Sequence, residues 1–293
     1  MLIVNPSSGG EKAKEYEALA KEKLVSLFDT VDVKHTEKGG DARQFAKEAA
    51  QKKYDSVIVM GGDGTVNEGI SGIAEQAYRP KFGFFPLGTV NDLARALNIP
   101  LDPEEAIEHF TLENQSPLDI GKINQSYFMN VVALGTIPEA VNNVESEDKT
   151  KLGKFAYFVS GVKELLNTES HQFHLVIDGK EMDLTSSTIL IGLTNSIGGF
   201  EHLLPNAEVD DGRLHLIYLK DASLLDTLKT VPDLLKGVEA STDKVGYYAF
   251  EELELSTIES EEKLTTNIDG DEGDALPIKV RILPSHLTVY GGQ

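Results

Sequence analysis

The chain has 293 residues, of which 40% are hydrophobic and 26% charged, a composition typical of a globular protein with room for two ordinary domains. Its net charge of −21 argues against nucleic acid as a partner. It has no cysteine, which excludes disulfides and thiolate metal sites. We find no secretory leader and no apolar run long enough to span a bilayer, and therefore expect a cytoplasmic protein.

Strands and helices alternate in the first half of the chain. Short apolar runs predict buried strands at 1–4, 31–36, 57–60 and 82–87. Apolar residues at helical spacing predict helices at 12–28, 42–53, 67–77 and 91–97, with Asp41 as the N-cap of the second. This alternation predicts an α/β domain with a parallel sheet covered on both faces, and ligands beyond the carboxyl ends of its strands.

The second half is rich in strands. We predict strands at 127–134, 173–177, 187–194, 214–219, 248–256 and 264–269, interrupted by helices at 152–167 and 224–236 and a polar loop at 142–151. This pattern indicates a mainly antiparallel β domain. The sequence therefore predicts two domains, residues 1–122 and 123–293, with the last strand (about 283–293) returning to the first domain.

Glycine-rich turns follow the strands of the first domain. The turn Asn5–Gly10 reads NPSSGG, and backbone N–H groups at such a strand-to-helix turn attract phosphate, although an ordinary serine-capped turn has the same pattern. Residues 61–68, GGDGTVNE, are more specific, because the glycines admit a phosphate chain and Thr65 begins the next helix with a hydroxyl. Asp63 would repel phosphate unless a divalent cation bridged them, so it implies Mg²⁺.

Other acidic residues occupy similar turns. Residues 86–92, PLGTVND, again place a Gly-Thr turn and an acid, Asp92, after a strand. Asp119, at the domain junction, is a third candidate. In the second half, VDDGRL at 209–214 contains Asp210 and Asp211, although Asp-Asp-Gly is also a good hairpin turn. The late stretch TTNIDGDEGD, 265–274, could hold calcium, but the EF-hand spacing is absent.

These motifs together resemble the diacylglycerol kinase catalytic family, and most of all its soluble bacterial lipid kinases. The resemblance rests on Asn5-Pro6 with its turn, GGDGTVNE, PLGTVNDLAR and DDGRL, in the family's order over nearly the whole chain. GGDGT alone would also fit NAD kinases and phosphofructokinases. The resemblance implies a Rossmann-like α/β domain of the phosphofructokinase and NAD-kinase kind, then a β-sandwich, with ATP bound in the cleft between them.

The resemblance also implies roles for particular residues. Asp63, Asp92 and Asp119 would form an acidic network with Asp211, which would hold Mg²⁺ together with the backbone carbonyls of Glu208 and Arg213. Asp63, Asp211 and Asp271 would be the catalytic acids. ATP would contact Asn5, Pro6, Ser7, Ser8, Gly9, Thr36, Gly62, Asp63, Gly64, Thr65, Val66, Asn67, Glu68 and Thr89.

One departure concerns the base that deprotonates the acceptor hydroxyl. The family usually reads Asp-Gly-Glu where this chain has Asp269-Gly270-Asp271, so the base would be Asp271, with Glu272 as the neighbouring alternative. The expected activity is ATP- and Mg²⁺-dependent phosphorylation of diacylglycerol to phosphatidic acid at a membrane surface, by a protein that could form a homodimer. The alternatives are another lipid acceptor (a sphingoid base, another glycerolipid or a polyprenol) or a non-catalytic nucleotide sensor.

Overall fold

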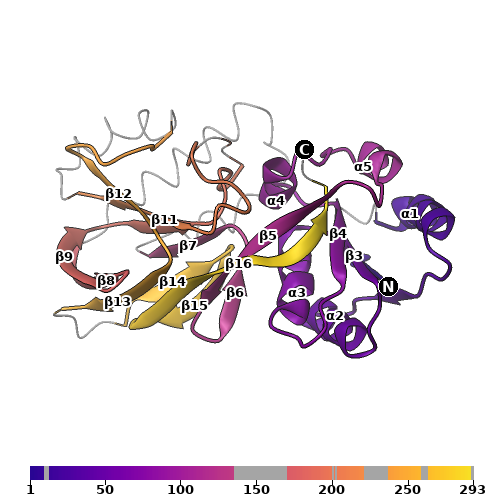
Figure 1. Ribbon diagram of the computed structural model, residues 1–293, viewed down its shortest axis with the longest axis horizontal. Helices are drawn as coiled ribbons and strands as arrows, with labels where there is room; N and C mark the ends of the chain where they lie inside the picture. Colours follow the sequence, from indigo (N-terminus) through magenta and orange to yellow (C-terminus); the bar gives the residue numbers. More distant parts are fainter. Residues whose placement is uncertain are drawn as a thin grey trace.

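The computed structural model describes residues 1–9, 13–134, 170–199, 201, 203–220, 237–258 and 263–291. The helices predicted at 152–167 and 224–236 and the loop predicted at 142–151 lie outside these ranges. Within the described ranges, no helix is long and apolar enough to cross a bilayer. Two domains lie end to end, and both chain termini lie in the first of them (Figure 1).

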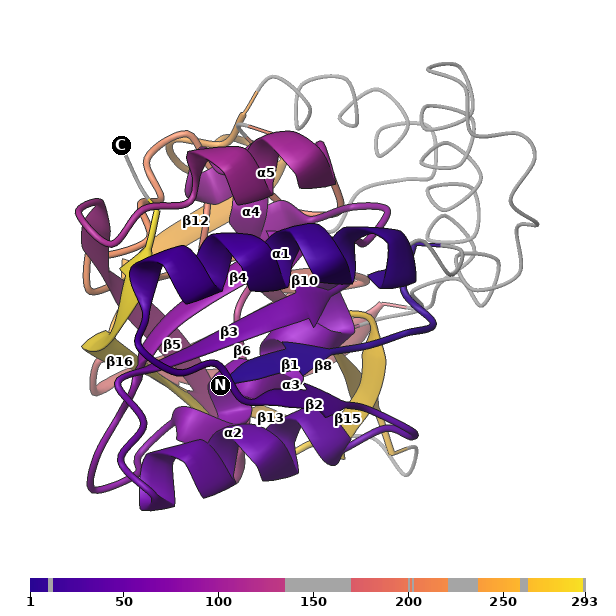
Figure 2. The ribbon, with the colours of Figure 1, turned by 90° about the vertical axis from the view of Figure 1, so that its right-hand side faces the viewer.

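The first domain is a parallel sheet between two layers of helices, as predicted (Figure 2). Its strands run in the order β2 (Val33–His35), β1 (Leu2–Val4), β3 (Ser56–Gly61) and β4 (Lys81–Pro86). α1 (Ala13–Leu27) and α5 (Pro103–His109) cover one face, and α2 (Asp41–Gln51) and α3 (Asp63–Ile73) cover the other.

Alternation along β3 explains the two layers. Every residue of β3 is buried, as is typical of a strand in the middle of a parallel sheet. Ile58 and Met60 pack with the α1 and α5 side, whereas Val57 and Val59 pack with the α2 and α3 side. Successive side chains of a strand point to opposite faces, so one apolar run serves both layers.

A glycine allows α2 and α3 to pack closely. A Cβ atom added at Gly72 would overlap the carbonyl oxygen of Arg43 and lie 2.8 Å from the Cβ of Ala46. Replacing Gly72 by alanine is therefore expected to lower the free energy of unfolding by about 1–3 kcal/mol, because α2 must move away. Chemical denaturation measures this change.

Gly64, in the same helix, is the matched control for that measurement. A Cβ added at Gly64 meets nothing within 4 Å, and its backbone is helical. Alanine at this position is expected to raise the free energy of unfolding by up to about 1 kcal/mol, since alanine favours the helix more than glycine does. Equal effects at the two positions would show that the helix contact does not depend on Gly72.

The second domain contains two antiparallel layers, which confirms the predicted β-sandwich architecture. One layer has the order β12 (Val245–Phe250), β11 (Leu214–Leu219), β10 (Ile189–Gly192), β7 (Val131–Leu134), β14 (Thr265–Ile268) and β15 (Asp271–Ala275). The other contains β13 (Glu252–Thr257), β8 (His171–Ile177), β9 (Lys180–Ser186), β5 (Gln115–Ile123), β6 (Ser126–Phe128) and β16 (Ile278–Tyr290). Side chains of both layers share the largest apolar cluster.

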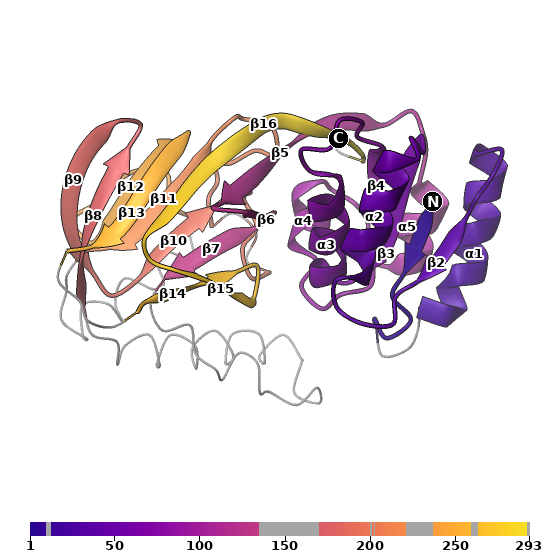
Figure 3. The same ribbon diagram turned by 90° about the horizontal axis from the view of Figure 1, so that it is seen from below.

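The strand β16 belongs to both domains (Figures 1 and 3). It pairs antiparallel with β13 in the second domain and parallel with β4 in the first, where Val289 is opposite Phe82. Between them it pairs antiparallel with β5, from Ile123 to Gln115. Its end is buried in the first domain, because the ring of Tyr290 packs edge-on against Phe110 and its hydroxyl lies 2.6 Å from Ser56 Oγ. One ten-stranded sheet therefore runs through the molecule.

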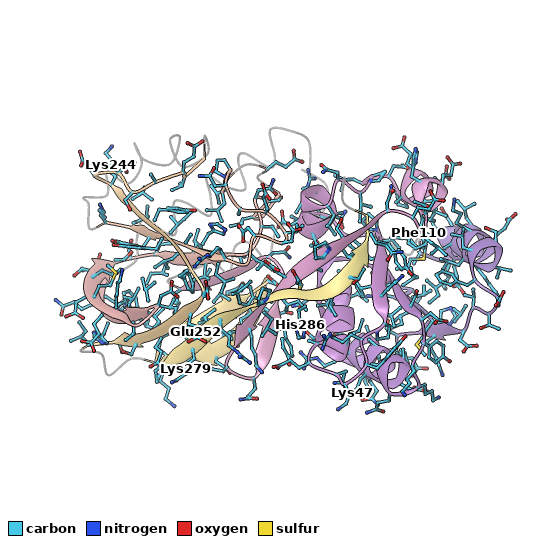
Figure 4. The ribbon with its side chains drawn as sticks, in the orientation of Figure 1. Lys47, Phe110, Lys244, Glu252, Lys279 and His286 are labelled. Carbon is cyan, nitrogen blue, oxygen red and sulfur yellow. The ribbon has the colours of Figure 1, made fainter. Side chains whose placement is uncertain are left out.

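A side chain of β16 also bonds to the first domain. The N–H group of Glu75, just after α3, donates to His286 Nε2 over 2.9 Å, and Figure 4 shows His286 at the junction. Burial, together with the nearby cations Arg79 and Arg281, lowers the pKa of His286. The imidazole is therefore kept neutral, in the form that can accept this hydrogen bond.

Several predicted boundaries were wrong. Residues 248–256, predicted as one strand, are parts of β12 and β13 in different layers, joined at Glu251. α3 begins at Asp63, four residues before the predicted start. Gly40, not Asp41, is the N-cap of α2, and the Asp41 carboxylate accepts the N–H groups of Glu37 and Lys38. Residues 127–134, also predicted as one strand, form β6 and β7 in different layers. The sequence did not predict α5, β5, β9 or β15.

Candidate active site

The turns after β1 and β3 lie against each other. Asn5 Nδ2 donates to Thr65 Oγ1 over 2.9 Å, while Asn5 Oδ1 accepts the N–H of Ser7 over 3.0 Å. Thr36 lies beside this turn, since its N–H donates to the carbonyl of Val4. Pro6, Ser8 and Gly9 continue the same turn. The structure thus brings the predicted phosphate-binding residues of three strand ends together.

The two glycine-rich turns after β3 and β4 approach each other closely. A Cβ at Gly62 would lie 3.2 Å from the Cα of Gly88, and a Cβ at Gly88 would lie 2.5 Å from Asn91 Oδ1. Side chains at these positions would force the turns apart. Gly64 and Thr89 beside them are exposed, so the surface that the turns form is open to a ligand.

Other predicted ATP contacts are engaged within the protein. The side chain of Val66 is buried in the core, and Asn67 Oδ1 accepts a hydrogen bond from Ser71 Oγ. The Glu68 carboxylate accepts the N–H groups of Gly40 and Ala42 over 2.8 and 3.2 Å, so it lies at the beginning of α2. In this arrangement Glu68 ties α3 to the turn that follows β2.

Asp63 joins the two glycine-rich turns. Its carboxylate accepts the N–H of Asn91 over 2.9 Å and that of Asp92 over 3.1 Å, at the beginning of α4 (Asp92–Ala96). Burial raises the pKa of Asp63, the nearby Asp92 adds to the rise, and the two backbone donors oppose it. An anionic Asp63 in this place is favoured further by any cation that binds beside it.

Asp92 extends this chain of contacts into the second domain. Its carboxylate is only 5% exposed and accepts Ser196 Oγ over 2.6 Å, Gly198 N–H over 2.7 Å and Gly199 N–H over 2.8 Å. All three donors belong to the loop that follows β10. Asp63, the beginning of α4 and Asp92 therefore connect the turn after β3 to the second domain by direct hydrogen bonds.

Replacing Asp92 by asparagine is expected to lower the free energy of unfolding by about 1–3 kcal/mol, because the amide NH₂ would face a backbone N–H of Gly198 or Gly199. Hydrogen exchange at both glycine amides should become faster. Asp243→Asn, on an exposed residue, controls for the loss of one negative charge. Unchanged exchange at 198–199 would show that Asp92 does not hold this loop.

Asp119 and Asp211 form a second acidic group. Asp119 accepts the N–H of Gly212 over 2.7 Å and that of Ser285 over 2.5 Å, and so ties the Asp-Asp-Gly turn to β16. Burial raises the pKa of Asp119, and the neighbouring Asp211 and Asp210 add to the rise. Asp211 is therefore close to Asp119, whereas Asp63 is close to Asp92.

The Asp211 loop contains oxygen atoms of the kind that Mg²⁺ prefers as ligands. Asp211 accepts the N–H groups of Glu208 and Arg213, which brings the backbone of both predicted carbonyl ligands around its carboxylate. Carboxylate and carbonyl oxygens suit this hard cation, and the surrounding acids favour a positive charge. In the described ranges no three His, Cys, Asp or Glu side chains converge as a metal site, so a metal here would rely on backbone oxygens.

A buried histidine supports the Asp211 loop, and the sequence reading did not identify it. His215 Nε2 lies 3.0 Å from Asp211 Oδ2, and its Nδ1 lies 2.8 Å from the hydroxyl of Tyr247. The His215 side chain is 3% exposed. The only sequence signal was the spacing of four residues between Asp211 and His215, which is too common to indicate a contact.

The late acidic turn also lies at the junction of the domains. The Asp269 carboxylate accepts the N–H groups of Met129 and Val131, just after β6, and β6 contacts α3, so this turn lies near the first domain. Asp271, the predicted base, is exposed at the beginning of β15, and Glu272 follows it. Asp274 is engaged elsewhere, since it accepts a hydrogen bond from Asn124 Nδ2. Neighbouring residues in a strand point to opposite faces, so Asp271 and Glu272 cannot both face the same site.

Comparisons with known proteins give the same assignment as the motifs. Residues 1–123 match the family model described as "Diacylglycerol kinase catalytic domain", and residues 130–291 match the "YegS C-terminal NAD kinase beta sandwich-like domain". A diacylglycerol kinase of Staphylococcus carnosus is 38% identical over 99% of this chain and 94% of its own length. One of Bacillus subtilis is 35% identical over 98% of this chain and 94% of its own length.

A solved structure agrees with the fold over the same extent. A crystal structure of a diacylglycerol kinase from Bacillus anthracis superimposes with a TM-score of 0.79 at 26% identity, over 99% of this chain and 96% of that one. The match covers both domains and nearly the whole length of both chains. The chain belongs to the diacylglycerol kinase family and is a lipid kinase.

Proposed function

We propose that this protein transfers the γ-phosphate of ATP to the free hydroxyl of diacylglycerol, in a Mg²⁺-dependent reaction that yields phosphatidic acid and ADP. The observation that carries the proposal is the close approach of the glycine-rich turns at Gly62 and Gly88, with the Asp63 carboxylate between them. The names of the relatives support diacylglycerol as the acceptor.

The turns of the first domain bind the phosphates of ATP. Backbone N–H groups at the beginning of α3 and in the turn at Asn5–Gly9 carry partial positive charge and suit the phosphate oxygens. Phosphoryl transfer depends mainly on positioning and on neutralising charge. The close contact between the two glycine-rich turns is suited to positioning the phosphates.

Asp271 accepts the proton of the reaction. As the acceptor hydroxyl attacks the γ-phosphorus, its proton passes to the Asp271 carboxylate, the bond from the γ-phosphorus to the bridging oxygen breaks, and ADP leaves. Asp271 is exposed, and no partner for its carboxylate is found among the described residues, so it is free to meet a substrate. Asp211, with the carbonyls of Glu208 and Arg213, would hold Mg²⁺, and Asp63 would add negative charge beside the phosphates. The ion would supply charge neutralisation at the phosphate oxygens.

The experiment measures transfer of label from γ-labelled ATP to lipids in mixed micelles with and without Mg²⁺. Diacylglycerol, a sphingoid base, a monoacylglycerol and a polyprenol are compared at equal surface concentration. The proposal expects labelled phosphatidic acid as the fastest product and none without Mg²⁺. Faster labelling of another lipid would support phosphate transfer but show that diacylglycerol is not the preferred acceptor. Transfer without any divalent cation would contradict the proposal that the acidic residues hold Mg²⁺.

The protein is expected to meet its substrate at a membrane surface as a peripheral protein. Diacylglycerol resides in the bilayer, and the high net negative charge of the chain, −21, disfavours approach to anionic lipid. Sedimentation with vesicles of zwitterionic and anionic composition tests this association. Light scattering at the same concentrations tests the proposed homodimer.

A further inference from the structure

The turn that presents Asp271 is a two-residue hairpin with an unusual attachment. Ile268 pairs with Asp271, and the residues between them have positive φ angles, 50° at Asp269 and 101° at Gly270. Two consecutive left-handed residues form the tight hairpin turn that matches the twist of the strands. Because Asp271 is the first residue after the turn, the position of the turn sets the position of Asp271.

The Asp269 carboxylate fixes this turn to another part of the domain. It accepts the N–H of Met129 over 2.7 Å, that of Asn130 over 2.9 Å and that of Val131 over 2.8 Å, while the Asp269 N–H donates to the carbonyl of Val131. The three donors are consecutive and form the corner between β6 and β7. A hairpin turn does not require these bonds, and the partners are about 140 residues away in the chain.

The choice of aspartate over asparagine is informative. Asn-Gly suits such a turn as well as Asp-Gly does. At position 269, however, Met129 donates to Oδ2 while Asn130 and Val131 donate to Oδ1, so both oxygens must accept. Asparagine would direct an NH₂ group at one of these N–H donors. The contacts with residues 129–131 therefore require aspartate at position 269, whereas the turn alone does not.

Burial of the Asp269 carboxylate carries an energetic cost, which the N–H donors of the corner reduce. Burial raises the pKa of Asp269 to about 6 from an ordinary 3.8, and the charge of Asp63 contributes. Because the pKa in the fold is the higher one, the fold binds the proton more tightly than the unfolded chain. The resulting stabilisation is complete below pH 3.8 and is lost as the pH rises through about 6. The protein retains a costly carboxylate at neutral pH, next to its proposed active site.

From these contacts we infer that Asp269 is a positioning residue, which holds the hairpin turn on the Met129–Val131 corner and thereby places Asp271 against the acceptor hydroxyl. The inference rests on the proposed function, since it takes Asp271 as the base. Asp269 does not itself touch the reacting atoms. It acts because the Asp271 carboxylate has no protein partner of its own in the described ranges and depends on the turn for its place.

The chain contains a matched control for this inference. Asp178 and Gly179 form the hairpin turn between β8 and β9, with φ angles of 47° and 77°, and Ile177 pairs with Lys180. Asp178 also accepts two N–H groups of a neighbouring strand, those of Glu251 and Glu252, and its own N–H donates to Glu252. Both donors bond to Oδ1, so asparagine keeps both bonds. Figure 4 shows Glu252 in the second domain, away from the junction.

The test compares Asp269→Asn with Asp178→Asn in the full chain. Asp269→Asn is expected to lower kcat for lipid phosphorylation about 10- to 100-fold with KM for ATP within about twofold, the size of loss that a displaced catalytic group produces. Hydrogen exchange at the amides of 129–131 should become faster. Asp178→Asn should leave kcat and the exchange at 251–252 unchanged. Unchanged exchange at 129–131 in Asp269→Asn would overturn the attachment itself.

A double-mutant cycle separates positioning from general support. If Asp269 acts through Asp271, the variant Asp269→Asn/Asp271→Ala is no slower than Asp271→Ala alone. Losses that multiply would overturn the inference, as would wild-type kcat in Asp269→Asn when Asp271→Ala is slow. A wild-type kcat in Asp271→Ala would show instead that Asp271 is not the base. That result would overturn the role of Asp271 in the proposed function, and the inference about Asp269 with it.

Discussion

Alanine at Asp271 is expected to lower kcat of lipid phosphorylation by about 10²–10⁴-fold, the usual contribution of a general base, with little change in KM for ATP. The residue is exposed at the beginning of β15, and its carboxylate makes no hydrogen bond or ion pair in the described part of the chain, so its removal leaves the fold intact. Single-turnover transfer of labelled phosphate measures the chemical step directly.

Two further variants identify the carboxylate that acts. Asp271→Glu introduces the side chain that the family usually has at this position and is expected to keep kcat within about tenfold, because the carboxylate moves by one methylene on a flexible arm. Glu272→Ala is expected to keep wild-type kcat, since neighbours in a strand face opposite ways. The reverse result, a slow Glu272→Ala with a normal Asp271→Ala, would transfer the role of base to Glu272.

Asparagine at Asp63 is expected to lower kcat/KM about 10³-fold, because the charge that compensates a cation at the phosphates is lost. The side chain also caps α4 through the N–H groups of Asn91 and Asp92, so the substitution removes a cap as well as a charge. Titration of activity with Mg²⁺ distinguishes the two causes. A lost charge weakens the response to Mg²⁺, whereas a lost cap lowers stability alone.

Asp102 provides the control for the cap. It is the N-cap of α5 and accepts the N–H groups of Glu104 and Glu105, as Asp63 does at α4, but it lies outside the proposed site. Asp102→Ala is expected to lower the free energy of unfolding by about 1 kcal/mol while kcat/KM is retained. If Asp63→Asn changed activity no more than Asp102→Ala does, Asp63 would have a capping role only.

The sequence predicted those parts of the fold that depend on local pattern. The buried run at 57–60 followed by GGDGT indicated a strand end that admits phosphate, because strand period and glycine placement are visible within a few residues. The beginning of α3 within the same stretch was not predicted, because the glycines at 62 and 64 disfavour a helix in isolation. Packing of α3 against β3 and α2 overrides that preference in the fold.

Other features could not be predicted because their partners are remote in the chain. β12 ends with the buried Phe250, and β13 has its buried residues at Leu253 and Leu255. The alternation of buried and exposed residues is therefore interrupted around Glu251, where the chain passes from one layer to the other. The role of Asp269 depends on the backbone at 129–131, and that of Asp92 on the loop at 196–199. A carboxylate that accepts distant N–H groups has no signature in its own neighbourhood.

The path of β16 affects how the protein can be synthesised. Residues 1–122 leave the ribosome first, but the edge of β4 is completed only by Val289, and the pocket beside Phe110 only by Tyr290. At about 5–20 residues per second, synthesis of the remaining part takes on the order of ten to thirty seconds. During that time the edge of β4 in the first domain is open to other strands, and it is closed only when β16 docks. The domain that is translated first is thus the last to be completed.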